Sequence, residues 1–119
     1  MKTTRWSPDT CNCQIEIEWD ETVLAENRTH TMKTILRCDE HIAKPNQEAF
    51  TDVMAENQSK NKAIGLLITE HPEVKQEDVK WEMKPDRSVK IILPDSIKSE
   101  KSSLNALAIG KFEKGVIFE

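Results

Sequence analysis

The chain has 119 residues, of which 37% are hydrophobic and 32% charged, and its formal net charge is −4. This length is enough for one compact domain and scarcely for two. Acidic and basic residues are spread evenly over the chain without a basic cluster, which argues against strong, nonspecific binding to duplex nucleic acid. The longest apolar runs are too short to span a bilayer.

Cysteine usage points to a reducing compartment. The chain has three cysteines, which cannot all pair with one another, so a disulfide framework is not expected. No apolar segment typical of a secretory signal follows the first residues. We therefore expect a cytoplasmic protein with no membrane association.

The first predicted element is a β-strand over residues 13–19, where apolar and polar residues alternate strictly. One face carries Cys13, Ile15, Ile17 and Trp19. A second, less regular strand is predicted over residues 30–38. Its apolar face is assigned to His30, Met32, Thr34, Leu36 and Cys38. If the two strands pair as an antiparallel hairpin, Lys33 and Arg37 can face Glu16 and Glu18 across it.

A long helix is predicted over residues 47–70, with Asn46 as its N-cap and Pro72 beyond its end. Its apolar stripe consists of Phe50, Val53, Met54, Ile64, Leu67 and Ile68. Asn57 and Asn61 interrupt this stripe. Two interpretations stay open: the middle of the helix is only half covered, or the two amides form a buried pair that sets register or contacts a partner.

The C-terminal part reads as a second hairpin, a shorter helix and a last strand. Residues 79–83 and 89–93 alternate around a turn at residues 85–88, a helix is predicted over 99–112, and a strand over 116–118. The predicted fold class is α+β with the order β-β-α-β-β-α-β. A weak boundary near Pro45 separates a zinc-binding hairpin lobe, residues 1–45, from an α+β remainder, residues 46–119, and we expect both to pack as one domain.

A metal site is the chemistry that the sequence indicates most directly. Cys11 and Cys13 form C-x-C before the first strand, and Cys38 and His41 form C-x-x-H after the second. When the two strands pair, the start of the first and the end of the second lie side by side, so the two ligand pairs can converge on one tetrahedral ion. The pattern therefore predicts a structural zinc site with no open coordination position. His30 is an alternative fourth ligand. Free or buried cysteines beside a surface His41 are the alternative without metal.

Other chemistries find less support. A reactive C-x-C thiol needs a nearby cation or helix N-terminus, and the neighbours Asp9, Thr10, Asn12 and Gln14 are not cationic. Three scattered glycines cannot build a phosphate-binding loop. The acidic residues of the first strand are typical of a solvated face. We therefore predict a protein that is not an enzyme.

Several segments resemble small uncharacterised proteins encoded by bacteriophages and environmental bacteria. The segments are WSPDTCNC at 6–13, IEIEWD at 15–20, CDEH at 38–41 and ENQSKN at 56–61. The resemblance implies a phage or bacterial context, and with it a virion location as well as a cytoplasmic one. It implies no activity.

The function predicted from the sequence is that of a small zinc-stabilised protein that binds a macromolecular partner. A protein is the expected partner, and Trp6, Trp19 and the acidic strand face are the expected contact region. The alternative is a nucleic-acid-associated regulator, and a thiol oxidoreductase is a third hypothesis.

Overall fold

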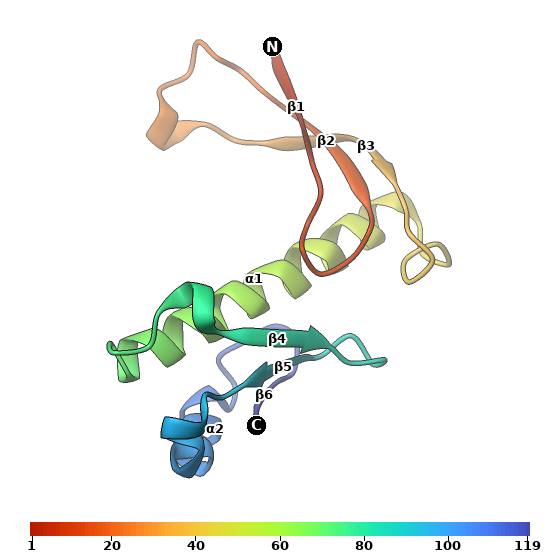
Figure 1. Ribbon diagram of the computed structural model, residues 1–119. Coiled ribbons are helices and arrows are strands. Elements are labelled where there is room, and N and C mark those ends of the chain that lie inside the picture. The colour runs from red at the N-terminus through yellow and green to blue at the C-terminus, as the bar shows by residue number, and fades with distance from the viewer. The chain divides into compact units, whose positions relative to one another are not determined.

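The computed structural model describes residues 1–119 and has the predicted α+β class (Figure 1). In chain order the helices and strands are β1 Lys2–Trp6, β2 Gln14–Trp19, β3 Thr31–Leu36, α1 Asn46–Glu70, β4 Lys80–Met83, β5 Val89–Ile92, α2 Lys101–Ala108 and β6 Val116–Phe118. Short 3-10 helices lie at Ala25–Asn27, Gln76–Asp78 and Asp95–Glu100.

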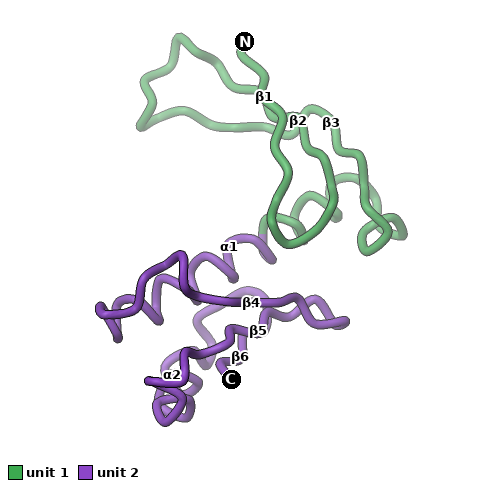
Figure 2. Tube along the Cα trace, in the orientation of Figure 1, with its two compact units in different colours: residues 1–54 green, residues 55–119 purple.

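The chain divides into two compact units, residues 1–54 and residues 55–119 (Figure 2). The boundary between the units falls within α1, after Met54, whereas the sequence suggested a boundary near Pro45, before the helix. The reason lies in the packing of the first turns of α1. Ala49 and Val53 are fully buried in the core of the first unit, so this part of the helix belongs with the N-terminal strands.

The first unit contains a three-stranded antiparallel sheet in the order β1-β2-β3. The predicted hairpin is therefore present as β2 and β3, and β1 is an additional strand that the sequence pattern did not predict. Trp6 is the only large apolar residue of β1, so alternation gives little signal there. Pairing with β2, from Lys2 opposite Trp19 to Trp6 opposite Ile15, defines this strand instead.

A β-bulge corrects the predicted faces of the second hairpin strand. Ile15 lies opposite Ile35, but Ile17 lies opposite Met32, so β3 carries one extra residue between them. The prediction placed Leu36 inward and Ile35 outward. In the structure Ile35 is 7% exposed and Leu36 is 69% exposed, because an extra residue inverts the alternation on one side of the bulge.

The core of the first unit is small. Its buried members are Cys13, Ile15, Ile35, Ala49 and Val53. Around them pack the partly buried Trp6, Cys11, Ile17, Met32, Cys38 and Phe50. Two of the residues at its border and one at its centre are cysteines, so this core merges directly with the predicted metal ligands.

The second unit has a mixed sheet in the order β4-β5-β6. β4 pairs antiparallel with β5 as a hairpin, and β6 pairs parallel with β5 after the crossover through α2. α2 ends earlier than the predicted helix: Gly110 has φ 73°, a left-handed conformation that terminates helices. The core of this unit consists of Ala63, Ile64, Leu67, Val74, Val79, Val89, Ile91, Leu93, Ile97, Leu104, Ala108 and Phe118.

The polar residues that α1 buries are not the predicted amides. Asn57 is half-buried and Asn61 is exposed, so a buried amide pair is wrong. Glu56, Ser59 and Lys60 are buried instead, with exposed fractions of 0%, 2% and 5%. The helical period places these three residues on the face that meets the second sheet, one position away from the predicted stripe.

Each buried polar side chain of α1 has a specific partner within the second unit. Arg87 donates two hydrogen bonds to the Glu56 carboxylate, from Nε at 3.0 Å and from Nη2 at 2.9 Å. The Lys60 ammonium lies 4.9 Å from the centre of the Trp81 ring. The Ser59 hydroxyl accepts a hydrogen bond from the Lys114 backbone N–H at 3.1 Å. These contacts compensate for removing charged and polar groups from water.

Candidate metal centre

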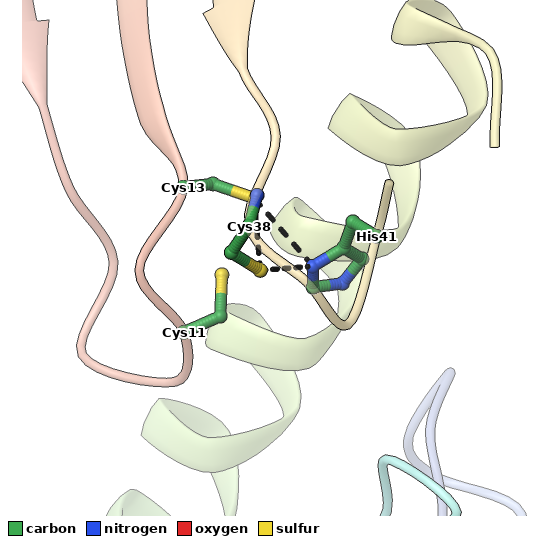
Figure 3. A group of neighbouring side chains, drawn as sticks. All are labelled: Cys11, Cys13, Cys38 and His41. Atoms are coloured by element: carbon green, nitrogen blue, oxygen red, sulfur yellow. Dashed lines mark hydrogen bonds between the residues drawn. The ribbon is translucent and has the colours of Figure 1, made fainter. Parts of the chain in front are cut away.

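The four predicted ligands come from two loops at the same end of the first sheet. Cys11 and Cys13 lie in the loop that joins β1 to β2, and Cys38 and His41 lie in the turn that follows β3 (Figure 3). Because β2 pairs with β3, the beginning of one strand lies beside the end of the other. The antiparallel pairing therefore brings two sequence segments separated by more than twenty residues to one place.

Local hydrogen bonds hold both loops. The Ser7 hydroxyl donates to the Cys13 carbonyl at 3.0 Å, which ties the loop before β2 to its own start. The His41 backbone N–H donates to the Cys38 carbonyl at 3.0 Å and closes the turn after β3. Cys38 lies beyond the end of β3, so this turn, and not the alternation of the strand, sets the direction of its side chain.

The four side chains converge on a common point, as Figure 3 shows. One ligand atom from each of Cys11, Cys13, Cys38 and His41 lies within 4.8 Å of every other. The Cys13 and Cys38 sulfurs are 3.4 Å apart, and Nδ1 of His41 lies 3.5 Å from the first and 3.1 Å from the second.

These distances fit the outline of a tetrahedral metal site. With metal–sulfur bonds of about 2.3 Å and a metal–nitrogen bond of about 2.1 Å, neighbouring ligand atoms of a tetrahedron lie about 3.6 to 3.8 Å apart. The observed separations of the three atoms in closest contact are a few tenths of an ångström shorter. The donor set of three sulfurs and one imidazole nitrogen is one that zinc favours. The cluster can therefore hold a metal ion after a small rearrangement, in which these three atoms move slightly apart.

Burial keeps the thiols of the cluster neutral when no cation is bound. Cys13 is 0% exposed and His41 is 2% exposed. Burial raises the pKa of the Cys11 thiol, and the neighbouring Cys13 and Cys38 thiols add to this effect. Burial likewise raises the pKa of the Cys38 thiol, with a further contribution from the Glu40 side chain. A bound cation reverses this effect, since it stabilises thiolates directly.

Backbone amides point at the sulfurs as well. The Cys38 N–H donates to the Cys13 sulfur at 3.3 Å. Backbone N–H groups of Asn12 and Glu40 hydrogen-bond the Cys38 sulfur and act to lower the pKa of its thiol. Such donors neutralise part of the negative charge that three thiolates bring to a metal, and they orient the ligands before the ion binds.

His41, and not His30, lies with the cysteines. His30 packs its ring against Trp19, with the ring centroids 5.2 Å apart, toward the end of β2 that is remote from Cys13. The geometry thus resolves the choice of histidine that spacing left open. It also identifies Nδ1 of His41 as the nitrogen that faces the sulfurs.

The expected contact region on the first sheet is partly neutralised. Glu16 forms ion pairs with Lys33 at 3.5 Å and with Arg5 at 3.7 Å, so the predicted pairing of Lys33 across the hairpin is present. Arg37 does not face the acidic residues as predicted, since its guanidinium donates to the Lys44 carbonyl. Trp6 and Trp19 are both half-buried.

The comparisons with known proteins give no relative. No family model matches the chain, and neither the curated proteins nor the solved structures contain a match. No helix of the structure combines the length and apolar character needed to cross a bilayer.

Proposed function

We propose that this chain is a small binding protein whose N-terminal unit is stabilised by one structural zinc ion, held by Cys11, Cys13, Cys38 and His41. The observation that carries the proposal is the convergence of four ligand atoms within 4.8 Å at the border of a small core. Four protein ligands complete a tetrahedral shell and leave no position for a substrate, which is the arrangement of structural sites.

The electrostatics of the cluster support a structural role over thiol chemistry. A nucleophilic cysteine needs a depressed pKa, and burial raises the pKa of both Cys11 and Cys38. In this proposal the ion shapes the first unit, and the unit presents its surface to a protein partner. The half-buried Trp19, packed against His30 at the rim of the sheet, is the aromatic contact residue that we propose.

A phage or bacterial context is part of the proposal and rests on the sequence resemblance alone. It places the protein in a bacterial cytoplasm or a virion. A nucleic-acid partner is the alternative outcome of the binding experiment described below.

The metal is tested by elemental analysis of freshly purified protein and two histidine variants. We expect about one zinc ion per chain in the wild type, loss of that zinc in His41→Ala, and its retention in His30→Ala, because only His41 faces the sulfurs. The His30 variant controls for the loss of an imidazole elsewhere in the same unit. Wild-type protein without a stoichiometric transition metal would refute the proposal.

The partner is tested by affinity capture from a bacterial lysate with wild-type protein and Trp19→Ala as parallel baits. A protein retained by the wild type and lost with Trp19→Ala supports the proposed contact region. Retention of nuclease-sensitive material that elutes with moderate salt would favour the nucleic-acid alternative, since phosphate contacts depend strongly on salt. Equal metal content in both baits shows that the substitution left the site intact.

A further inference from the structure

The outer edge of β1 is the open side of the N-terminal sheet. β1 pairs with β2 alone, and its five residues, Lys2–Trp6, contain no proline and no bulge. An edge strand of this kind presents unpaired backbone N–H and C=O groups that can accept another strand. The opposite edge differs: β3 is interrupted by a bulge, one of the devices by which proteins prevent strand addition.

In the second unit, a side chain covers the outer edge of β6. The Asn105 side chain donates to the Phe118 carbonyl at 3.1 Å and accepts from the Phe118 N–H at 2.8 Å, which occupies the outward groups of β6. The fold therefore covers the edge at β6 and distorts the edge at β3, whereas β1, like β4 in the second sheet, is a regular edge strand.

An apolar groove lies directly beside the open strand. It is lined by Thr4, Arg5, Trp6, Ile17 and Met54. Register places Thr4 opposite Ile17 and Trp6 opposite Ile15, so both side chains are on the face of the sheet that carries the core. α1 covers the part of this face around Ile15, which is 1% exposed, whereas Ile17 and Trp6 stay half-buried.

We propose that β1 pairs antiparallel with β1 of a second copy of this chain, about a two-fold axis at Thr4, to form a continuous six-stranded sheet. This register is the one that pairs all five residues of the strand with residues of the same strand in the other copy. Thr4 then lies opposite Thr4, Lys2 opposite Trp6, and Thr3 opposite Arg5. A two-fold interface requires such self-complementarity, because each patch meets itself.

The chemistry of each pair favours this register. On the groove face, Lys2 lies opposite Trp19 of its own chain, and its ammonium lies 3.7 Å from the Glu21 carboxylate. In the dimer Lys2 would also lie opposite Trp6 of the second copy, where its alkyl stem can pack on the indole ring while the ion pair with Glu21 is kept. On the other face Arg5 would lie opposite the small Thr3 and keep its ion pair with Glu16. A register centred on Arg5 would instead place two arginines directly opposite each other, which is unfavourable.

The apolar groove also favours β1 of a second copy as its occupant. In the proposed pairing, Lys2 and Thr4 of the second copy lie over the rim formed by Thr4 and Trp6, and they cover apolar surface that one copy leaves in water. This self-association does not depend on the identity of the metal, and its failure would leave the metal site untouched.

The proposal is tested by sedimentation velocity of the metal-loaded protein, with charge substitutions at the two-fold axis. We expect a monomer–dimer equilibrium for the wild type. Thr4→Lys and Thr4→Glu should each raise the dimer dissociation constant at least tenfold, since each places like charges directly opposite each other. An equimolar mixture of the two variants should restore the dimer, because lysine then faces glutamate. Thr4→Val, uncharged and of similar size, should dimerise like the wild type.

The controls are the far-UV circular dichroism and zinc content of every variant, which should equal those of the wild type. A wild type that stays monomeric at several hundred micromolar would overturn the proposal. So would a dimer that persists in both charge variants, or a mixture of the variants that stays monomeric although each one is folded.

Discussion

The two units of this chain reach a packed core in different ways. The N-terminal unit buries five apolar residues, one of which is the candidate metal ligand Cys13. The C-terminal unit buries twelve, from α1, β5, α2, β6 and the segments that connect the elements of this unit. Small units seldom gain enough from apolar burial to offset the conformational entropy lost on folding. The comparison supports the proposal that a metal ion supplies to the first unit a stability that the second obtains from its own side chains.

The two units also differ in how their buried polar groups are compensated. The first unit gathers three sulfurs and an imidazole, which become stable when a cation joins them. The second buries the Glu56 carboxylate fully but supplies the Arg87 guanidinium itself, as a two-bond pair. With the proposed ion bound, the first unit takes its compensating positive charge from solution, whereas the second has it in the side chain of Arg87.

Removal of the metal should produce the largest effect, and this effect should be confined to the first unit. With a strong chelator, we expect hydrogen exchange protection to disappear from residues 1–45 and to persist in β5 and α2, because the free energy of structural zinc binding is folding free energy. Cys38→Ser should reproduce the effect and lower the stability of the first unit by several kcal/mol. Unchanged melting and exchange after stripping would show that the small core folds without an ion.

The buried ion pair provides the second largest effect, in the other unit. Arg87→Ala should destabilise the second unit by about 3 to 5 kcal/mol in chemical denaturation, since it leaves the Glu56 carboxylate buried without its partner. Zinc content should stay at the wild-type level. Arg87→Gly separates the backbone contribution: Arg87 has φ 67°, which glycine adopts without strain, so this variant should be less destabilised than Arg87→Ala by about 1 kcal/mol.

Truncation of one buried side chain in each core tests the two units separately. Leu67→Ala should lower the stability of the second unit by about 3 kcal/mol, since Leu67 is fully buried among many apolar neighbours. Val53→Ala removes fewer carbon atoms from the first core and should cost about 1 to 2 kcal/mol in the metal-loaded protein. The Val53 variant should become markedly easier to unfold by chelation, whereas Leu67→Ala should not; equal sensitivity of both to chelator would contradict the division of the two cores.

The smallest expected effect on stability concerns two turns, one in each unit, that contain the same two hydrogen bonds. Asp20 accepts hydrogen bonds from the Thr22 hydroxyl and N–H, and Asp86 accepts the same two bonds from Ser88. Both bonds lower the pKa of each carboxyl below its ordinary value of 3.8, and the bond from the hydroxyl contributes more than the bond from the backbone N–H.

A lowered pKa in the folded state means that each turn stabilises the fold above the unfolded-state pKa and loses this contribution as the pH falls through the folded-state value. The stability difference between wild type and Asp86→Ala should therefore be small and constant near neutral pH and shrink below about pH 4. Asp20→Ala should behave alike in metal-loaded protein at the pH values where zinc stays bound. A difference that grows on acidification would contradict this assignment.

Features that depend on a local residue pattern could be predicted from the sequence alone. Strict alternation identified β2, apolar periodicity with flanking prolines identified α1, and the ligand spacing identified the four residues that converge, because each signal lies within a short window of the chain. The sequence also defined the α+β class, since the succession of such patterns is itself a property of the sequence.

The remaining features depend on contacts between residues that are distant in the sequence. β1 exists because β2 offers it hydrogen-bonding groups, and its own residues carry almost no alternation. The bulge in β3 reversed the face of Ile35 and Leu36, and the turn after β3, rather than strand alternation, aimed Cys38 at its partners. Glu56 and Lys60 are polar and lie inside because Arg87 and Trp81, distant in sequence, supply compensating contacts. Whether a polar or weakly patterned residue is buried depends on partners that folding brings to it, and no local pattern contains them.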